Sequence, residues 1–208
     1  RDLQLRRPVA ERLVAAARDA LPTRDAAIAR QILAADLVLL ADLDDQIRAA
    51  ETALESLLPH SPYATLTSVP GWGVVRVSNY AAALGDPRRW PGPRQIYRAS
   101  GLSPMQYESA HKRRDGGISR EGSVALRRAL IDLGMGLWLN EPAAKNYAKG
   151  LKARGKHGGV VACALAHRAN RIAHALVRDH ATYEPTRWAL TPSTGERNCA
   201  ETLHNPSR

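Results

Sequence analysis

The sequence contains no phenylalanine, two cysteines and two methionines, and it has no long apolar run. Cys163 and Cys199 are too few and too far apart for a disulfide framework or a zinc-ligand pattern. No run approaches the roughly 20 apolar residues that cross a bilayer, and the start shows no signal-peptide pattern. We therefore expect a soluble chain from a reducing compartment, without membrane contact. Because it begins at Arg1 rather than Met, we expect either a fragment of a longer protein or a processed chain.

Charge is distributed unevenly along the 208 residues, whose net charge is +10. Residues 1–58 carry 8 Lys/Arg against 10 Asp/Glu, whereas residues 59–208 carry 22 against 10. Such an asymmetry predicts that the second part meets a polyanion. The alternative is a solvated basic surface that aids solubility. The composition, 44% hydrophobic and rich in Leu and Ala, favours an all-α fold.

Residues 1–60 are predicted to form a helical arm. A short helix over residues 8–21 precedes a run without Gly or Pro from Arg24 to Leu58. Within that run a heptad seam is formed by Leu40, Leu43, Ile47, Ala50, Leu54 and Leu57. A helix of about 50 Å indicates a coiled coil or a dimerising arm. The alternative is a long helix packed on its own domain, with residues 37–40 buried.

Acidic residues also lie along this arm. Asp36, Asp42, Asp44 and Asp45 follow one another within the helix, and we do not assign them to a metal site.

Residues 61–185 are predicted to form a helical domain that begins with a helix-hairpin-helix. The turn Val69-Pro-Gly-Trp-Gly73 lies between a short helix and a helix over residues 74–84. Gly71 and Gly73 let the backbone turn sharply, and the free N–H groups of the following helix can hold a phosphate. Such a contact positions nucleic acid without reading bases. A plain αα-hairpin is the alternative.

Further helices are expected over residues 94–100, 123–140, 143–153 and 160–179, with a polar, disordered tail over 186–208. Cys163 falls in the apolar pattern of the last helix. His167 and His174 are interpreted as polar-face residues rather than metal ligands. Trp188 in the tail is a candidate docking contact.

Basic residues concentrate in two stretches. Residues 88–128 contain ten Lys/Arg and three acids, with Trp90, Tyr97 and Tyr107 interleaved. This pattern is typical of surfaces that hold strands by charge and stacking. Residues 145–178 contain eight Lys/Arg and no acid, which indicates a second basic surface.

Ser109 is a candidate nucleophile. It precedes the basic run His111 to Arg114 and a Gly116-Gly117 break, so a hydroxyl on a loop is surrounded by cations that stabilise developing charge. Ser103 precedes a proline in a turn, and Ser119 is expected to cap the next helix. There is no Gly-x-Ser-x-Gly elbow, so hydrolase chemistry is poorly supported. On residue chemistry alone, an ordinary loop serine remains the alternative.

A series of motifs resembles one family, in order and with matching spacing from about Leu66 to Pro185. The motifs are Val-Pro-Gly-Trp-Gly (69–73), Leu-Gly-Asp-Pro-Arg-Arg-Trp (84–90), Gly-Leu-Ser-Pro (101–104), Glu-Ser-Ala-His-Lys (108–112), Gly-Gly-Ile-Ser-Arg-Glu-Gly (116–122) and Leu-Arg-Arg-Ala-Leu (126–130). They resemble the C-terminal half of the insertion-sequence transposases of the IS110 and IS1111 group. The acidic arm resembles the coiled-coil linker of that family.

The resemblance implies a bacterial recombinase, cytoplasmic and nucleoid-associated, that acts on DNA under a guide (bridge) RNA and works as a dimer or tetramer. It implies that the catalytic serine is Ser109, although Ala110 stands where the family usually has glycine. An upstream domain with four acidic residues would bind Mg²⁺; this chain does not contain it and needs no cofactor of its own.

We expect DNA or RNA contacts from Gly71, Gly73, Lys112, Arg113, Arg114, Arg120, Arg127 and Arg128. The rival hypothesis is a non-catalytic helix-hairpin-helix binding module on a dimerising arm.

Overall fold

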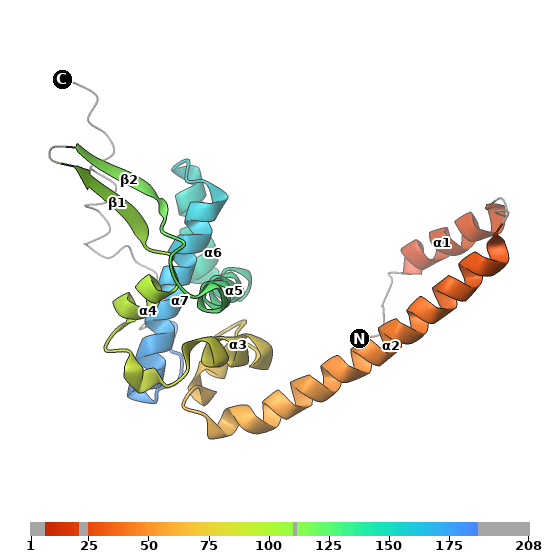
Figure 1. Ribbon diagram of the computed structural model, residues 1–208, viewed down its shortest axis with the longest axis horizontal. Coiled ribbons are helices and arrows are strands. Elements are labelled where there is room, and N and C mark those ends of the chain that lie inside the picture. Colours follow the sequence, from red (N-terminus) through yellow and green to blue (C-terminus); the bar gives the residue numbers. More distant parts are fainter. Residues whose placement is uncertain (1–6, 21–24, 110–111, 187–208) are drawn as a thin grey trace. The chain divides into compact units, whose positions relative to one another are not determined.

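The computed structural model describes residues 7–20, 25–109 and 112–186 (Figure 1). The chain divides into two compact units, Arg1–Ala53 and Leu54–Arg208. The boundary falls inside one long helix. Seven α-helices dominate the described residues, so the predicted all-α class is confirmed. The predicted tail and Trp188 lie outside the described residues.

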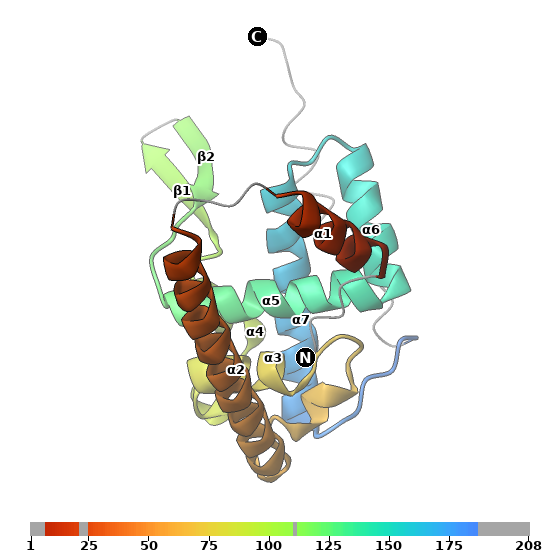
Figure 2. The ribbon, with the colours of Figure 1, turned by 90° about the vertical axis from the view of Figure 1, so that its right-hand side faces the viewer.

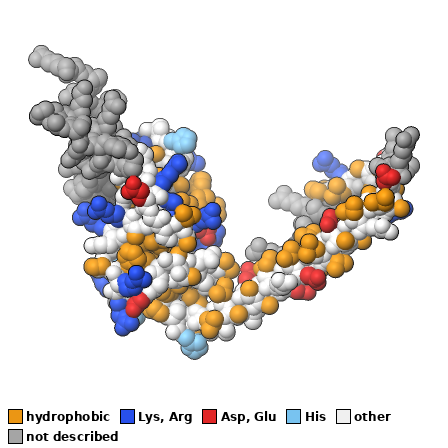
Figure 3. All heavy atoms as spheres, in the orientation of Figure 1, with side chains coloured by type: hydrophobic (Ala, Val, Ile, Leu, Met, Phe, Trp, Pro, Cys, Tyr) orange, Lys and Arg blue, Asp and Glu red, His pale blue; other side chains and the backbone are white. Residues whose placement is uncertain are grey.

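The first unit contains α1 (Arg7–Asp19) and most of α2 (Ala26–Leu57). The long uninterrupted helix was therefore predicted to within two residues. Neither helix buries a residue, and hydrophobic side chains run along α2 in Figure 3. Leu37, Val38, Leu39 and Leu40 are 53–63% exposed, and the alternative of a long helix packed on its own domain stays a prediction. The coiled coil stays a prediction.

The second unit is built around α5 (Val124–Asn140) and α7 (Gly158–Asp179), which cross in Figure 2. Gly134 makes the close approach possible, because a Cβ there would lie 2.7 Å from the Ala166 nitrogen. The apolar stripes of both helices are buried, and each large aliphatic side chain contributes about 1.5–3 kcal/mol. Their buried leucines and isoleucine are Leu126, Leu130, Leu133, Leu137, Leu165, Ile172 and Leu176.

The remaining helices surround this pair. They are the short 3₁₀ helices η1 (Leu58–His60), η2 (Ala64–Ser68) and η3 (Pro87–Arg89), with α3 (Val74–Leu84), α4 (Pro93–Ala99) and α6 (Pro142–Ala153). Cys163 is half-buried against the core, as its place in the apolar pattern predicted, and burial raises the pKa of its thiol. No helix in the described ranges is long and apolar enough to cross a membrane.

The cap of α5 differs from the sequence prediction. Ser123, not Ser119, is the N-cap, and its hydroxyl accepts a hydrogen bond from the Leu126 N–H at 3.2 Å. Gly122 separates the two candidates and has φ of 142°, which an L-residue rarely adopts, so the chain cannot continue as helix through it. The helix starts where the backbone first permits it.

The stretch expected to be a cationic loop is instead an antiparallel ribbon of two strands, β1 (Pro104–Ser109) and β2 (Lys112–Ile118). A register irregularity lies between Pro104 and Gln106. The helical pattern stops at Gly101, and the strands pair across the short connection at residues 110–111, which lies outside the described residues. Ser109 therefore ends a strand.

Candidate nucleic-acid interface

The turn at residues 69–73 packs closely against α5. Trp72 is buried, and its Nε1 donates a hydrogen bond to the Leu133 carbonyl at 2.9 Å. Gly71 has φ of 80°, and a Cβ there would lie 2.2 Å from Asn140 Nδ2 and 2.4 Å from the Gly136 carbonyl oxygen. Gly71 therefore serves close packing, and its predicted phosphate contact remains a prediction.

Gly73 has the opposite surroundings. It is the N-cap of α3, it is exposed, and nothing lies within 4 Å of the place a Cβ would occupy. The first N–H groups of α3 lack intrahelical acceptors, as at every helix start. The open space beside Gly73 and the free N–H groups at the start of α3 together form a position where an anion can bind to the backbone. The turn joins the 3₁₀ helix η2 to α3, so the predicted pair of helices is only half α-helical.

Arg76 fixes this turn, and the sequence reasoning missed it. Its Nη1 donates to the Gly71 carbonyl at 2.8 Å and its Nε donates to Asp132 Oδ1 at 3.0 Å. The Arg76 side chain keeps 32% of its surface exposed in the first turn of α3. An arginine in the first turn after Pro-Gly-x-Gly was the available signal.

The foot of the ribbon is held by backbone contacts between two segments. The Ser119 N–H donates to the Ser103 carbonyl at 2.9 Å, and the Arg120 N–H donates to the Gly101 carbonyl at 3.0 Å. A Cβ on Gly122 would lie 2.2 Å from the Ala99 carbonyl oxygen. The segments on either side of the ribbon therefore meet too closely for larger residues.

The two rival serines lie at this foot. The Ser119 hydroxyl donates to the Gly101 carbonyl at 3.4 Å, and both Ser103 and Ser119 are half-buried. Ser109 lies at the other end of β1, where its Cα pairs with that of Lys112 across the connection. Ala110 and His111 lie outside the described residues. The ribbon thus separates Ser109 from the two alternatives.

The register also sorts the predicted cations. Tyr107 pairs with Arg114, Glu108 pairs with Arg113, and Ser109 pairs with Lys112. Because successive strand residues alternate between faces, Ser109, Lys112 and Arg114 hold positions on one face and Arg113 holds a position on the other.

The three cations after the ribbon differ in their surroundings. Arg120 is exposed and adopts the left-handed conformation with φ of 57°, which is strained for a residue other than glycine. Arg127 is half-buried, and its Nη1 donates to the Ser100 carbonyl at 3.3 Å, so it stabilises the turn before the ribbon. Arg128 is exposed. Arg120 and Arg128 are therefore the accessible cations.

The basic residues of the second stretch lie on α6, on the turn after it and on α7, and Arg168 is the buried one among them. Lys145, Lys149, Lys152 and Arg154 are exposed, and Lys152 Nζ lies 4.6 Å from the centre of the Trp138 ring. Arg168 is only 7% exposed and lies over the Tyr147 ring at 4.0 Å. It therefore belongs to the core.

No cluster of three or more His, Cys, Asp or Glu residues that could hold a metal occurs in the part of the chain that the structure describes. His167, interpreted from sequence as a polar-face residue, is half-buried with its ring against that of Tyr97 at 4.9 Å between centroids. His174 is half-buried in the wall of a cavity between α3 and α7.

Comparison with known proteins relates this arrangement to transposases. Residues 63–149 match the model of the transposase IS116/IS110/IS902 family. The chain is 33% identical over 136 residues to the transposase for insertion sequence element IS1328 of Yersinia enterocolitica, covering 63% of this chain and 40% of that protein.

Two further relatives agree. An insertion element IS110 uncharacterized 43.6 kDa protein of Streptomyces coelicolor is 28% identical over 146 residues, which cover 70% of this chain and 36% of that protein. The transposase for insertion sequence element IS1111A of Coxiella burnetii is 30% identical over 92 residues, which cover 44% of this chain and 24% of that protein. The chain thus spans two fifths or less of these relatives. The family resemblance is confirmed: residues 63–149 match the IS116/IS110/IS902 transposase family, and the chain is similar to several insertion-sequence transposases.

Proposed function

We propose that this chain is the C-terminal part of a DNA transposase in which Ser109 cuts and rejoins strands. The observation that carries the proposal is the place of Ser109 at the end of β1, opposite Lys112, on a ribbon whose foot is fixed by close backbone packing. The family match covers this whole region. A nucleophile on a projecting ribbon can reach a phosphate that the helices do not contact.

The reaction that suits this arrangement is transesterification. The Ser109 hydroxyl loses its proton as its oxygen bonds to a DNA phosphorus, and the bond from that phosphorus to a strand oxygen breaks. The released strand hydroxyl takes up a proton. A hydroxyl of another strand then attacks the phosphoserine and restores Ser109. The number of phosphodiester bonds is unchanged, so the exchange needs no external energy.

The cations would stabilise the negative charge of this transition state and hold the strand. Lys112 and Arg114 share the face of Ser109 in the register, and Arg113 of the same basic run holds a position on the other face. Arg120 and Arg128 are accessible for backbone phosphates, and Arg127 supports the turn that carries the ribbon. Gly73 and the start of α3 would hold a further phosphate.

Other parts of the proposal concern the longer protein. The relatives exceed this chain in length, and the resemblance implies an upstream domain with four acidic residues that binds Mg²⁺. It also implies a guide RNA and an oligomer, for which the exposed apolar side of α2 is suited. The four acidic residues Asp36, Asp42, Asp44 and Asp45 lie on α2 and are not proposed as that site.

The test is covalent trapping in the full-length protein. Ser109→Ala should abolish the DNA–protein adduct and lower recombination by about a thousandfold or more, because the nucleophile is gone. Ser103→Ala is the matched control, since its serine lies at the foot of the same ribbon, and should retain the adduct. Adduct and recombination in the Ser109→Ala protein would refute the assignment.

The rival, a binding module without chemistry, makes the same binding prediction. Both expect the logarithm of affinity to fall with the logarithm of salt concentration by about 0.9 per phosphate neutralised. We expect the isolated 208-residue chain to bind nucleic acid and not to cut it. Metal-dependent cleavage by this chain alone would contradict that expectation.

A further inference from the structure

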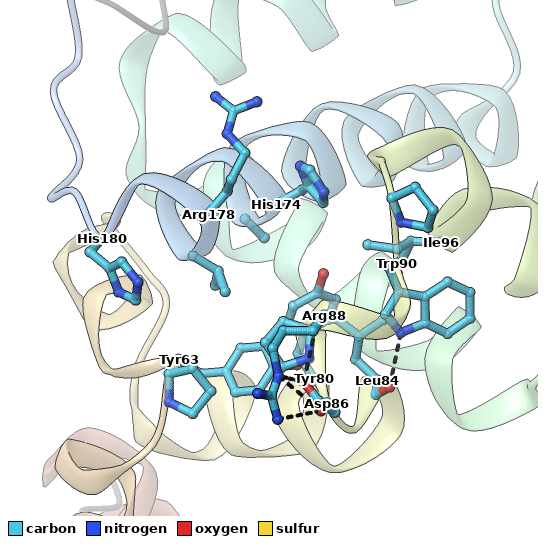
Figure 4. A pocket seen from close by; sticks show the side chains of 15 residues that line it. Tyr63, Tyr80, Leu84, Asp86, Arg88, Trp90, Ile96, His174, Arg178 and His180 are labelled. Carbon is cyan, nitrogen blue, oxygen red and sulfur yellow. Dashed lines mark hydrogen bonds and ion pairs between the residues drawn. The ribbon is translucent and has the colours of Figure 1, made fainter.

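A cavity of about 500 Å³ lies between α3, α7 and the loop that joins α3 to α4 (Figure 4). Its walls are largely aromatic and aliphatic, with Tyr63, Tyr80, Leu84, Trp90 and Ile96 among them. Well-packed protein cores leave few voids larger than a water molecule. This volume is in the range of cavities that hold small ligands. The motif at residues 84–90 supplies part of its wall, but the proposed reaction does not use it.

Of the polar groups on Tyr63, Tyr80 and Trp90, one lacks a hydrogen-bond partner among the described residues. The Tyr63 hydroxyl donates to the Gly85 carbonyl, and Trp90 Nε1 donates to the Leu84 carbonyl at 3.1 Å. The Tyr80 hydroxyl is buried and has no hydrogen-bond partner among the described residues. Burial raises the pKa of Tyr80 far above its usual value, so the hydroxyl remains a neutral donor. An unpaired buried hydroxyl is costly and calls for a partner.

The rim of the cavity carries two arginines and two histidines. His174 and Arg178 come from α7, His180 follows that helix, and Arg88 comes from η3, where its guanidinium lies at Asp86 (Figure 4). The Asp86 carboxylate is also in the lining, but it accepts from the Arg88 Nη2 at 2.9 Å and from the Arg88 N–H at 3.0 Å. Its charge is therefore offset within the wall. Arg178 is exposed and paired with Asp179.

We propose that this cavity receives one unpaired nucleobase of a DNA or RNA strand. The inference rests on the proposed function, because it takes nucleic acid as the ligand. A base offers apolar faces to the rings, an edge that can pair with the Tyr80 hydroxyl, and an attached phosphate that the polar side chains of the rim can contact. An apolar protein side chain would fill the space between the walls but leave the Tyr80 hydroxyl unpaired.

The test compares matched oligonucleotides on the whole chain at one salt concentration. One is a stem-loop with a single unpaired 2-aminopurine, and the other is the fully paired duplex of equal length and charge. We expect the stem-loop to bind about tenfold more tightly or better, as stacking of one base on an aromatic ring provides. The 2-aminopurine emission should change on binding. Repeating both measurements with DNA and with RNA oligonucleotides shows which kind of nucleic acid supplies the base.

Two variants locate the effect. Ala173→Leu places a larger side chain in the lining of the cavity, and Tyr80→Phe removes the unpaired hydroxyl while keeping the ring. Both should lower the preference for the stem-loop severalfold and leave duplex binding unchanged. Tyr147→Phe, a half-buried tyrosine outside the cavity lining, is the control. Tyr80→Phe should fold with undiminished melting temperature, because it removes an unsatisfied group.

The outcomes separate this proposal from the one on which it rests. Equal binding of stem-loop and duplex, or an unchanged preference in a folded Tyr80→Phe or Ala173→Leu chain, overturns the base site and leaves the nucleic-acid function standing. No binding of any oligonucleotide overturns both. If Ala173→Leu reduces self-association but not the stem-loop preference, the cavity holds a protein side chain and the base site is wrong.

Discussion

At the scale of single residues, Gly71 and Gly73 lie two positions apart in the same turn and meet opposite requirements. Gly71 has a left-handed φ and no space for a side chain, whereas Gly73 has an ordinary φ of −72° and open space. The motif Pro-Gly-x-Gly does not distinguish them. Only the packing of the turn on α5, at Gly136 and Asn140, assigns one glycine to folding and the other to accessibility.

This difference predicts different costs of substitution. Gly71→Ala should lower the free energy of unfolding by about 2–3 kcal/mol, from the left-handed backbone and the collision with α5. Gly73→Ala should change it by about 1 kcal/mol or less, because an N-cap alanine lacks only a favourable cap. Urea unfolding of the two variants measures both values. Equal losses would mean that the turn does not pack on α5 as described.

At the scale of secondary-structure elements, the register of the ribbon makes a prediction about catalysis. Lys112→Ala and Arg114→Ala should each lower covalent adduct formation in the full-length protein by about ten- to a hundredfold, because a charge near the reacting phosphate is lost. Arg113 holds a position on the other face of the ribbon, so Arg113→Ala is the matched control. It should have a smaller effect on the adduct and a comparable effect on the salt dependence of binding. A larger loss for Arg113→Ala would contradict the register.

The exposed apolar side of α2 makes a second prediction. Leu43→Asp and Ile47→Asp place charges in the heptad seam and should weaken self-association by tenfold or more, since burying each side chain provides about 1.5–3 kcal/mol. Ala49→Asp lies in the same helix outside the seam and should leave association unchanged. Sedimentation at several concentrations measures this. If the unsubstituted chain is monomeric at all concentrations, the coiled-coil prediction is wrong.

The helices were predictable because their signals are local. The apolar spacing in residues 124–140 and the absence of Gly and Pro in 26–57 act within a few turns. The ribbon was missed because its residues are basic, polar and glycine-rich, and strands form there through pairing rather than through a buried pattern. The cap of α5 was misplaced because two serines compete and only the backbone at Gly122 decides between them.

The candidate site could be predicted only in part. Ser109 as the nucleophile stays a prediction from the family resemblance, and its separation from Ser103 and Ser119 by a strand was not predicted from the sequence. The accessible cations could not be separated from Arg127 and Arg168 by sequence, because the contacts of those two side chains with Ser100 and Tyr147 span long stretches of chain. The cavity was beyond prediction, since its lining extends from Pro62 to His180.

At the scale of the whole molecule, buried tyrosines make stability depend on alkaline pH. Burial, with smaller contributions from nearby carboxylates, raises the pKa of Tyr63 and that of Tyr183 to about 12. In the unfolded chain tyrosine ionises near pH 10. The stabilisation is therefore complete below pH 10 and is lost as the pH rises toward 12, because only the unfolded chain releases protons in this interval.

We accordingly expect the melting temperature to fall steadily between about pH 10 and pH 12. Circular dichroism followed at a series of pH values measures this, and Tyr63→Phe should make the decline shallower. A decline of the same slope in that variant would assign the alkaline effect to other groups. The tyrosinate absorption of the folded chain should appear later in the titration than that of the unfolded chain.

Helix α5 has a consequence for substrate geometry. It starts directly after the foot of the ribbon, and at Gly136 it touches the turn that contains Gly71, whose carbonyl oxygen would lie 2.7 Å from an added Cβ. These points are twelve residues apart on one rigid helix, or about 18 Å. A nucleic-acid strand that contacts both points would span about five nucleotides between them. The length of the helix, not the base sequence, would set this spacing.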